Sequence, residues 1–312
     1  MTIAKTVLGI DVSKANLDVA ARPSGRAGRY ANTADGIARV VALAREQGAF
    51  VVLEATAAWD RALMLALETA EVPYHRANPG RARAFARATG LLAKTDQVDA
   101  GMLAKYGSAL DLPPAPPADP NRMRLQALSV RRDQLVEMRK AERIRLKALP
   151  DPEAAESLRA MLAFLGGQIA DFDARIRKLT AHAQDLARDG AILRSAPGVG
   201  PVCASVLLAC MPQLGRVDRR AIASLAGLAP VARDSGLLRG ARHVQGGRKR
   251  VRDALYMAAL AAIRSEAFRP RYERMRQAGK PAKLALVAIA RQLLVALNAA
   301  IRDQKPFSPM PA

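Results

Sequence analysis

Apolar and polar positions along residues 1–110 alternate in a way that predicts a mixed sheet covered by helices. Short runs rich in β-branched residues predict strands at 5–11, 16–21, 29–32, 50–54 and 72–77. Apolar residues spaced by three and four positions predict helices at 33–47, 57–71, 79–89 and 96–109. Three consecutive strands followed by helix–strand units indicate an α/β domain.

A proline-rich stretch at 111–120 predicts a stiff linker after this domain. Residues 121–189 then carry two helical arms, which are separated at Pro150-Asp-Pro152. The second arm has a heptad seam, which fits both a hairpin packed on itself and a seam for a second protomer. The seam positions are Leu158, Leu162, Leu165, Ile169, Phe172, Ile176, Leu179, Ala183 and Leu186.

Residues 190–312 form a third, mainly α-helical region and hold most of the charge. They contain 21 Lys and Arg against 6 Asp and Glu, in a chain whose formal net charge is +21. Such a charge indicates a polyanion partner, either nucleic acid or an anionic membrane surface. The apolar runs fall short of the ~20 residues that a spanning helix needs, and the N-terminus does not resemble a signal peptide. We therefore expect a cytoplasmic nucleic-acid protein with no membrane partner.

The residues that bind soft metals are scarce. Cys203 and Cys210 lie in an apolar helical run, which predicts buried thiols, and the three histidines are scattered. A zinc site is therefore not expected. Any metal must be held by oxygen ligands, which suits Mg²⁺ or Mn²⁺.

Four acidic residues stand where such a metal site could form. Asp11 and Glu54 each end a predicted strand, and Asp96 and Asp99 occupy the first turn of a predicted helix with Thr95 as its N-cap. If the two strands are parallel neighbours, the carboxylates converge and repel each other unless a divalent cation neutralises them. That arrangement is typical of a two-metal phosphodiester site. Unrelated turn residues and an acidic first turn are the alternative.

Glycines and basic residues of the last region are candidates for nucleic-acid contact. The stretch Pro197-Gly-Val-Gly200 resembles a helix-hairpin-helix turn that admits a phosphate, although a simple interhelical turn fits equally. The arginine- and glycine-rich stretch at 231–252 predicts a flexible loop along a phosphate chain. The candidates are Gly198, Gly200, Arg239, Arg242, Arg248, Lys249, Arg250 and Arg252. Ser235 lies in the same loop, where a serine is ordinarily a turn residue.

Several short motifs in this order resemble one family over almost the whole chain. The chain resembles transposases of the insertion-sequence 110 type, which are related to Piv-like DNA invertases and are also called bridge-RNA-guided recombinases. The motifs are Gly9-Ile10-Asp11, Leu53-Glu54-Ala55-Thr56, Lys94-Thr-Asp-Gln-Val-Asp-Ala100, Pro197-Gly-Val-Gly200, Ser224–Pro230, Ser235-Gly236 and Arg252-Asp-Ala-Leu-Tyr256.

The resemblance implies a RuvC-like, ribonuclease-H-type domain at 1–110, whose tetrad Asp11, Glu54, Asp96 and Asp99 binds Mg²⁺. It implies a C-terminal transposase domain at 190–312 in which Ser235 is the nucleophile that attacks DNA. It also implies a structured guide RNA and a homo-oligomer, either a dimer or a tetramer. One departure is Gln245-Gly-Gly-Arg248, where the family usually has a Lys-x-Gly-Asn-like segment.

Two other functions fit the same residues. A RuvC-like nuclease that resolves four-way DNA junctions would use the tetrad with water as the nucleophile and would leave Ser235 without a chemical role. A basic nucleic-acid-binding protein would use the four acids only for its structure.

Overall fold

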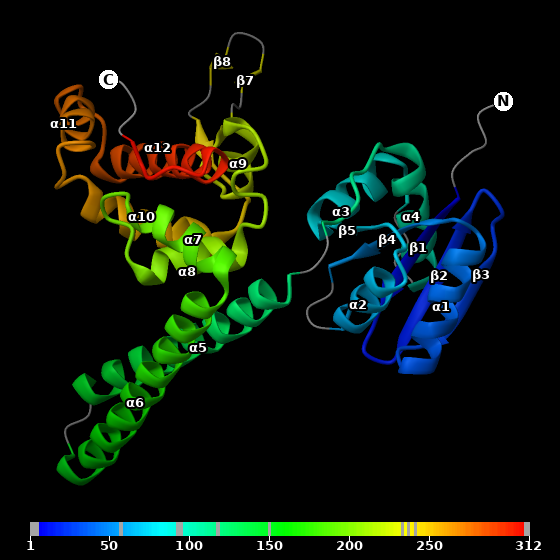
Figure 1. The fold of residues 1–312 in the computed structure, drawn as a ribbon, viewed down its shortest axis with the longest axis horizontal. Coiled ribbons are helices and arrows are strands. Elements are labelled where there is room, and N and C mark those ends of the chain that lie inside the picture. Colours follow the sequence, from blue (N-terminus) through cyan, green and yellow to red (C-terminus); the bar gives the residue numbers. More distant parts are fainter. Residues whose placement is uncertain are drawn as a thin grey trace. The chain divides into compact units, whose positions relative to one another are not determined.

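The computed structural model shows two compact units, Met1–Ala118 and Asp119–Ala312, which Figure 1 draws in blue to teal and in green to red. The residues that the structure describes are 6–55, 59–91, 96–116, 119–148, 151–231, 234–235, 238–239 and 242–308. The side chains of residues 96, 97, 234, 235, 238 and 239 are outside this description.

The first unit is built on a five-stranded mixed sheet in the order β3-β2-β1-β4-β5. The central strand β1 pairs antiparallel with β2 and parallel with β4. The mixed sheet predicted from the sequence is therefore confirmed. The strands are β1 (Val7–Val12), β2 (Asn16–Arg22), β3 (Ala27–Ala31), β4 (Phe50–Glu54) and β5 (Tyr74–Ala77).

Helices cover both faces of this sheet because its central strands are apolar on both sides. Leu8 and Ile10 of β1 belong to a core with α1 and α2, whereas Val7 belongs to a second core with α3 and α4. Since side chains alternate along a strand, Asp11 lies on the same face as Val7. The helices are α1 (Ala34–Glu46), α2 (Arg61–Thr69), α3 (Pro79–Ala88) and α4 (Asp96–Ala109).

The proline-rich segment begins as part of the first unit. The backbone N–H of Ala115 donates to the carbonyl of Tyr74 at 2.6 Å, and Nδ1 of His75 lies 2.8 Å from the carbonyl oxygen of Pro113. These contacts attach the segment to β5, the edge strand of the sheet. The segment therefore satisfies part of an edge that would otherwise expose unpaired backbone groups.

The second unit begins with a helical hairpin of α5 (Pro120–Ala148) and α6 (Pro152–His182). The two arms pack on each other through Leu135, Leu165 and Ile169, so the seam serves at least this intrachain contact. The seam was predicted to continue to Leu186, but α6 ends at His182 because Ala183 has an extended backbone. Leu186 instead belongs to the next helix.

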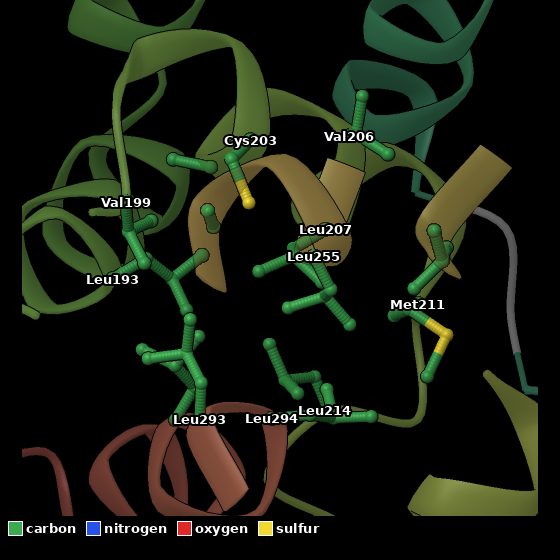
Figure 2. Close-up of a cluster of buried hydrophobic side chains, with 14 of the residues drawn as sticks. Leu193, Val199, Cys203, Val206, Leu207, Met211, Leu214, Leu255, Leu293 and Leu294 are labelled. Carbon is green, nitrogen blue, oxygen red and sulfur yellow. The ribbon is translucent and has the colours of Figure 1, made fainter. Parts of the chain in front are cut away.

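The rest of the second unit is a helical core, shown in Figure 2. Cys203 is buried in it and Cys210 is partly buried, and both are free thiols as predicted. Burial raises the pKa of Cys203 to about 12, which keeps its thiol protonated near neutral pH. The helices are α7 (Gln184–Arg194), α8 (Pro201–Cys210), α9 (Arg219–Leu225), α10 (Lys249–Ala262), α11 (Arg269–Gln277) and α12 (Ala282–Asp303).

Helix α12 lies through the middle of this core. Within the described part of the chain it is the helix that is long and apolar enough to cross a membrane, but 61% of its most apolar window is buried inside the protein. The expectation that every apolar run falls well short of spanning length was therefore wrong for α12. Its burial accounts for its hydropathy, since a core helix is apolar on most sides.

The sequence pattern missed α11 and the start of α10. No residue of α11 is fully buried, so apolar spacing gave little signal there; Phe268 just before it is buried in the core, and Tyr272 and Met275 pack against that core. Helix α10 begins at Lys249, within the stretch 231–252 that was predicted to be a flexible loop. Its first turn carries a run of basic residues, which the sequence suggested was loop.

We predict that a methyl group at Gly9 disrupts the first unit. A Cβ there would lie 2.1 Å from the carbonyl oxygen of Ala100 and 2.3 Å from the backbone N of Ala104, so α4 must move away from β1. Gly9→Ala should lower the free energy of unfolding by about 2–3 kcal/mol. Urea unfolding followed by the fluorescence of Trp59, the chain's single tryptophan, measures this unit.

Gly101→Ala is the matched control because Gly101 lies in α4 and a Cβ there meets no atom within 4 Å. It should stabilise the unit by about 0.5–1 kcal/mol, since alanine favours helix over glycine. Equal effects of the two substitutions would contradict the packing argument.

Candidate functional site

The ends of β1 and β4 bring two of the predicted acids together. The two strands are parallel neighbours, with Gly9 opposite Val52 and Ile10 opposite Leu53. Asp11 and Glu54 are the next residue on each strand, and both are half-buried. The condition on which the sequence argument rested, that these strands are parallel neighbours, is therefore met.

Helix α4 brings the second pair of acids to the same edge. Its residues Ala100 and Ala104 lie over Gly9, while Gly107 lies over Val7 and Val52. The helix therefore runs antiparallel to β1, and its first turn lies toward the carboxyl ends of β1 and β4. Asp96 and Asp99 occupy that turn, since α4 begins at Asp96.

The metal prediction concerns residues that the structure describes only in part. Asp99 is half-buried, while the side chain of Asp96 and the predicted N-cap Thr95 are outside the described residues. Among the described side chains, no three Asp, Glu, His or Cys residues group closely enough to hold a metal ion. The donor set consists of carboxylate oxygens, which fit Mg²⁺ or Mn²⁺ by their chemistry.

A fifth carboxylate beside this edge was missed from the sequence. Asp18 of β2 lies directly opposite Asp11 in the antiparallel register, so both side chains project on the α4 face. The side chain of Asp18 is 1% exposed and forms a two-point ion pair with Arg29 of β3, with Nε–Oδ1 at 2.8 Å and Nη2–Oδ2 at 3.1 Å. An acid between Leu17 and Val19 in an apolar strand was the available signal.

The Asp18–Arg29 pair offsets the repulsion between carboxylates on neighbouring strands. Like charges directly opposite each other destabilise a sheet, and a buried charge is costly without a partner. Arg29 supplies the opposite charge from the next strand, where it lies directly across from Asp18. Asp18 is therefore paired with an arginine next to the candidate site and is not one of the predicted ligands.

We predict that Arg29→Met lowers the free energy of unfolding of the first unit by about 1–2 kcal/mol, because it leaves Asp18 buried without its cation. The estimate lies below the value for a fully buried pair because Arg29 is about half exposed. Asp18→Asn combined with Arg29→Met should cost less than the sum of the single changes. Urea unfolding monitored by Trp59 measures the coupling.

Arg39→Met is the control, because Arg39 pairs with Asp35 on the exposed surface of α1. That change should have an effect near zero. Strictly additive effects of the Asp18 and Arg29 substitutions would show that the pair does not stabilise the sheet.

The two predicted glycines of the C-terminal turn lie in different surroundings. A Cβ on Gly198 would lie 2.2 Å from the carbonyl oxygen of Ala258 in α10, so this glycine allows the turn to pack on that helix. Gly200 is exposed, is the N-cap of α8, and has open space where a Cβ would be. Gly200 is therefore the better placed of the two for a ligand, and phosphate contact there stays a prediction.

Three of the predicted basic residues make contacts within the protein. Arg248 donates to Oε1 of Gln213 at 2.8 Å, and Nε of Arg250 lies 2.6 Å from Oδ2 of Asp133 in α5. Arg252 donates to the carbonyl oxygen of Gly246 at 2.7 Å and so holds the turn before α10.

The other three basic candidates differ in what the structure describes. Lys249 is exposed and pairs with Asp253 one helical turn later. Arg242 is exposed, and Arg239 is placed only by its backbone in β8. Nucleic-acid contact by all six basic residues stays a prediction.

We predict that Arg250→Met lowers the stability of the second unit by about 1 kcal/mol, because the ion pair with Asp133 joins α10 to α5. The measurements are thermal unfolding and the salt dependence of oligonucleotide binding. An unchanged melting temperature together with a salt slope reduced by about one would instead identify Arg250 as a phosphate contact.

Ser235 lies in a segment that the sequence predicted to be a flexible loop. In the structure this segment contains two short antiparallel ladders. The first ladder joins β6 (Pro230–Val231) to β9 (His243–Val244), and the second joins β7 (Asp234–Ser235) to β8 (Leu238–Arg239). Ser235 is opposite Leu238, and Figure 1 shows β7 and β8 beyond α9, at the outside of the helical body. Ser235 therefore belongs to the second unit and the four acids to the first.

Comparison with known proteins places both units among the transposases. Residues 8–151 match the DEDD transposase profile of the IS110 type, and residues 190–273 match the transposase IS116/IS110/IS902 family. The chain contains the two domains of IS110-family transposases, a class of enzymes that cut DNA and recombine it.

The relatives include a pilin gene-inverting protein and proteins of insertion elements. The pilin gene-inverting protein of Moraxella bovis is 28% identical over 324 residues, which cover 98% of both chains. An uncharacterized 44.8 kDa protein of insertion element IS116 from Streptomyces clavuligerus is 36% identical over 178 residues, 55% of this chain and 44% of that protein. An uncharacterized 43.6 kDa protein of insertion element IS110 from Streptomyces coelicolor is 37% identical over 125 residues, 39% of this chain and 31% of that protein.

Proposed function

We propose that this transposase cuts and exchanges DNA strands during insertion-sequence excision and insertion, through a Mg²⁺-dependent DEDD site and a covalent serine–DNA intermediate guided by a structured RNA. The observation that carries the proposal is the edge where β1 and β4 end side by side under the first turn of α4. The sheet order, with β1 antiparallel to β2 and parallel to β4, supports a RuvC-like, ribonuclease-H-type assignment for this unit.

In this proposal Asp11, Glu54, Asp96 and Asp99 hold the metal. Their carboxylates offer only hard oxygen donors, and their mutual repulsion favours a divalent cation at the edge that they share. When bound, Mg²⁺ or Mn²⁺ supplies phosphate polarisation and charge neutralisation. Asp18 takes no part as a ligand, because Arg29 already engages both of its oxygens.

Ser235 supplies the nucleophile. Its Oγ forms a bond to the phosphorus of a DNA phosphodiester, one ester P–O bond of the DNA breaks, and the serine proton leaves to a base while the departing sugar oxygen takes up a proton. The phosphoserine ester then stores the linkage until a hydroxyl of another strand attacks it and releases the serine. No external energy source is needed because one ester replaces another at each step.

The basic second unit supplies the nucleic-acid contacts in this proposal. Its 21 Lys and Arg residues between 190 and 312 suit both DNA and a structured RNA. Because the acids and Ser235 belong to different units, the proposed site needs the two units to meet, within one chain or between copies. A homo-oligomer, either a dimer or a tetramer, is also part of the proposal.

We predict that the full chain, incubated with Mg²⁺, DNA of the element ends and co-purified RNA, forms a covalent protein–DNA adduct on a denaturing gel. Ser235→Ala should abolish the adduct because it removes the attacking oxygen. Asp11→Asn should lower the yield of the adduct at least about a hundredfold, while DNA binding persists. Binding measured by gel shift separates lost chemistry from lost folding.

Arg39→Met serves as a surface control in the same unit and should leave the adduct unchanged. Cleaved DNA without an adduct, equal in wild type and Ser235→Ala, would refute the serine step and favour a junction endonuclease that uses water. An adduct unaffected by Asp11→Asn would refute the metal site.

A further inference from the structure

A groove in the second unit has five arginines around an apolar floor and is called here the arginine groove. It has a volume of about 640 Å³ and lies between α9, α11, α12 and the β6/β9 ladder. Its lining residues are Arg219, Arg220, Leu228, Pro230, Arg242, Val244, Arg271, Leu284, Val287, Ala288, Arg291, Gln292 and Val295. No acidic residue is among them.

Four of the five arginines of this groove form no ion pair among the described residues, although Asp218 interacts electrostatically with Arg219 and Arg220. Within the described part of the chain, no carboxylate forms an ion pair with any of these four, which are Arg219, Arg220, Arg271 and Arg291. The neighbouring acid Asp218 is engaged as the N-cap of α9, where it accepts from the backbone N–H groups of residues 220 and 221. Converging guanidinium groups repel each other unless an anion lies between them, and their planar donors match phosphate oxygens.

The floor of the groove contains an unsatisfied polar atom. Oε1 of Gln292 is buried and has no hydrogen-bond partner among the described residues. Apart from Arg291, the other α12 residues that line the groove are apolar, including Leu284, which is 49% exposed, and Val287. A buried acceptor beside apolar walls fits a flat group that carries N–H donors, such as the edge of an unpaired nucleobase.

The groove is adjacent to the strands that carry Ser235. Pro230 and Val244 line it and face each other in the β6/β9 ladder, from which the chain continues to β7 with Ser235 four residues after Val231. The groove wall at Pro230 is therefore five residues from the serine in the chain. Of the predicted basic residues, only Arg242 lines this groove, so most of it was missed from the sequence.

We propose that the arginine groove binds a single-stranded stretch of nucleic acid next to the reacting phosphate, with phosphates on Arg219, Arg220 and Arg291 and one unpaired base against Gln292. The part of this proposal that places the strand next to the reacting phosphate rests on the proposed function. The binding measurement below does not depend on the chemistry of Ser235. DNA and RNA share this phosphodiester and base chemistry.

The test is fluorescence anisotropy of the full chain with short labelled single-stranded DNA and RNA over a series of salt concentrations. Arg219→Ser combined with Arg291→Ser should weaken binding on the order of tenfold at ~0.1 M salt and reduce the slope of log affinity against log salt by about 1.4. Arg124→Ser combined with Arg159→Ser is the charge-matched control, since both arginines are exposed on the hairpin and outside the groove. It should change neither quantity.

Gln292→Leu tests the base contact separately from the charge. It should lower affinity for ordinary oligonucleotides severalfold and leave unchanged the affinity for an oligomer of abasic sugar phosphates, which has no base to contact the amide. The salt slope should stay that of the wild type. Arg219→Lys combined with Arg291→Lys, which keeps the charge and the fold, should retain most of the slope.

The arms of the experiment distinguish the sources of the strand. Slope loss with DNA alone identifies the DNA strand, and slope loss with RNA alone identifies the guide RNA. An unchanged slope in the folded arginine variant overturns the proposal and favours a protein segment as the occupant of the groove. Adduct formation by Ser235 is measured on the same variants. If even the wild type forms no adduct, the proposed serine chemistry fails, and the salt-slope result for the groove still stands by itself.

Discussion

The close approach of α4 to β1 is the contact on which the candidate site depends. Because Gly9 has no side chain, the backbone of α4 at Ala100 and Ala104 can lie directly on the strand. This contact sets the direction of the helix and places its first turn at the edge where Asp11 and Glu54 end their strands. Two acids from a sheet and two from a helix, which are spread along the chain from Asp11 to Asp99, are thereby brought to one edge.

Crowding of acids at this edge explains the buried pair beside it. Asp18 faces Asp11 across two antiparallel strands, and Arg29 compensates its charge from the third strand. Asp60, on the other face of the sheet, follows the same rule, since it is fully buried and pairs with Arg76 at 2.7 Å. Each of these two buried carboxylates thus has an arginine partner on a strand of the sheet.

The second unit shows why a count of basic residues does not locate a binding surface. Arg248 and Arg250 lie in the most basic run of the sequence, yet they contact Gln213 and Asp133 inside the unit. The arginine groove instead gathers residues from α9, α11 and α12 that are up to about 70 positions apart. Unpaired charge around a concave apolar floor, rather than charge density along the chain, is what marks a candidate ligand site.

The sequence by itself determined the five strands of the first unit, most helices and the four acids at element ends, because periods of 2 and 3.6 residues follow from backbone geometry and are visible locally. It also indicated, through short motifs, the family that the comparisons confirm. Only the tertiary structure decided that Asp18 lies beside Asp11, that α6 ends before Leu186, and which arginines face the groove. These depend on the register and packing of distant segments, and a local pattern contains no information about which distant residue will supply a partner.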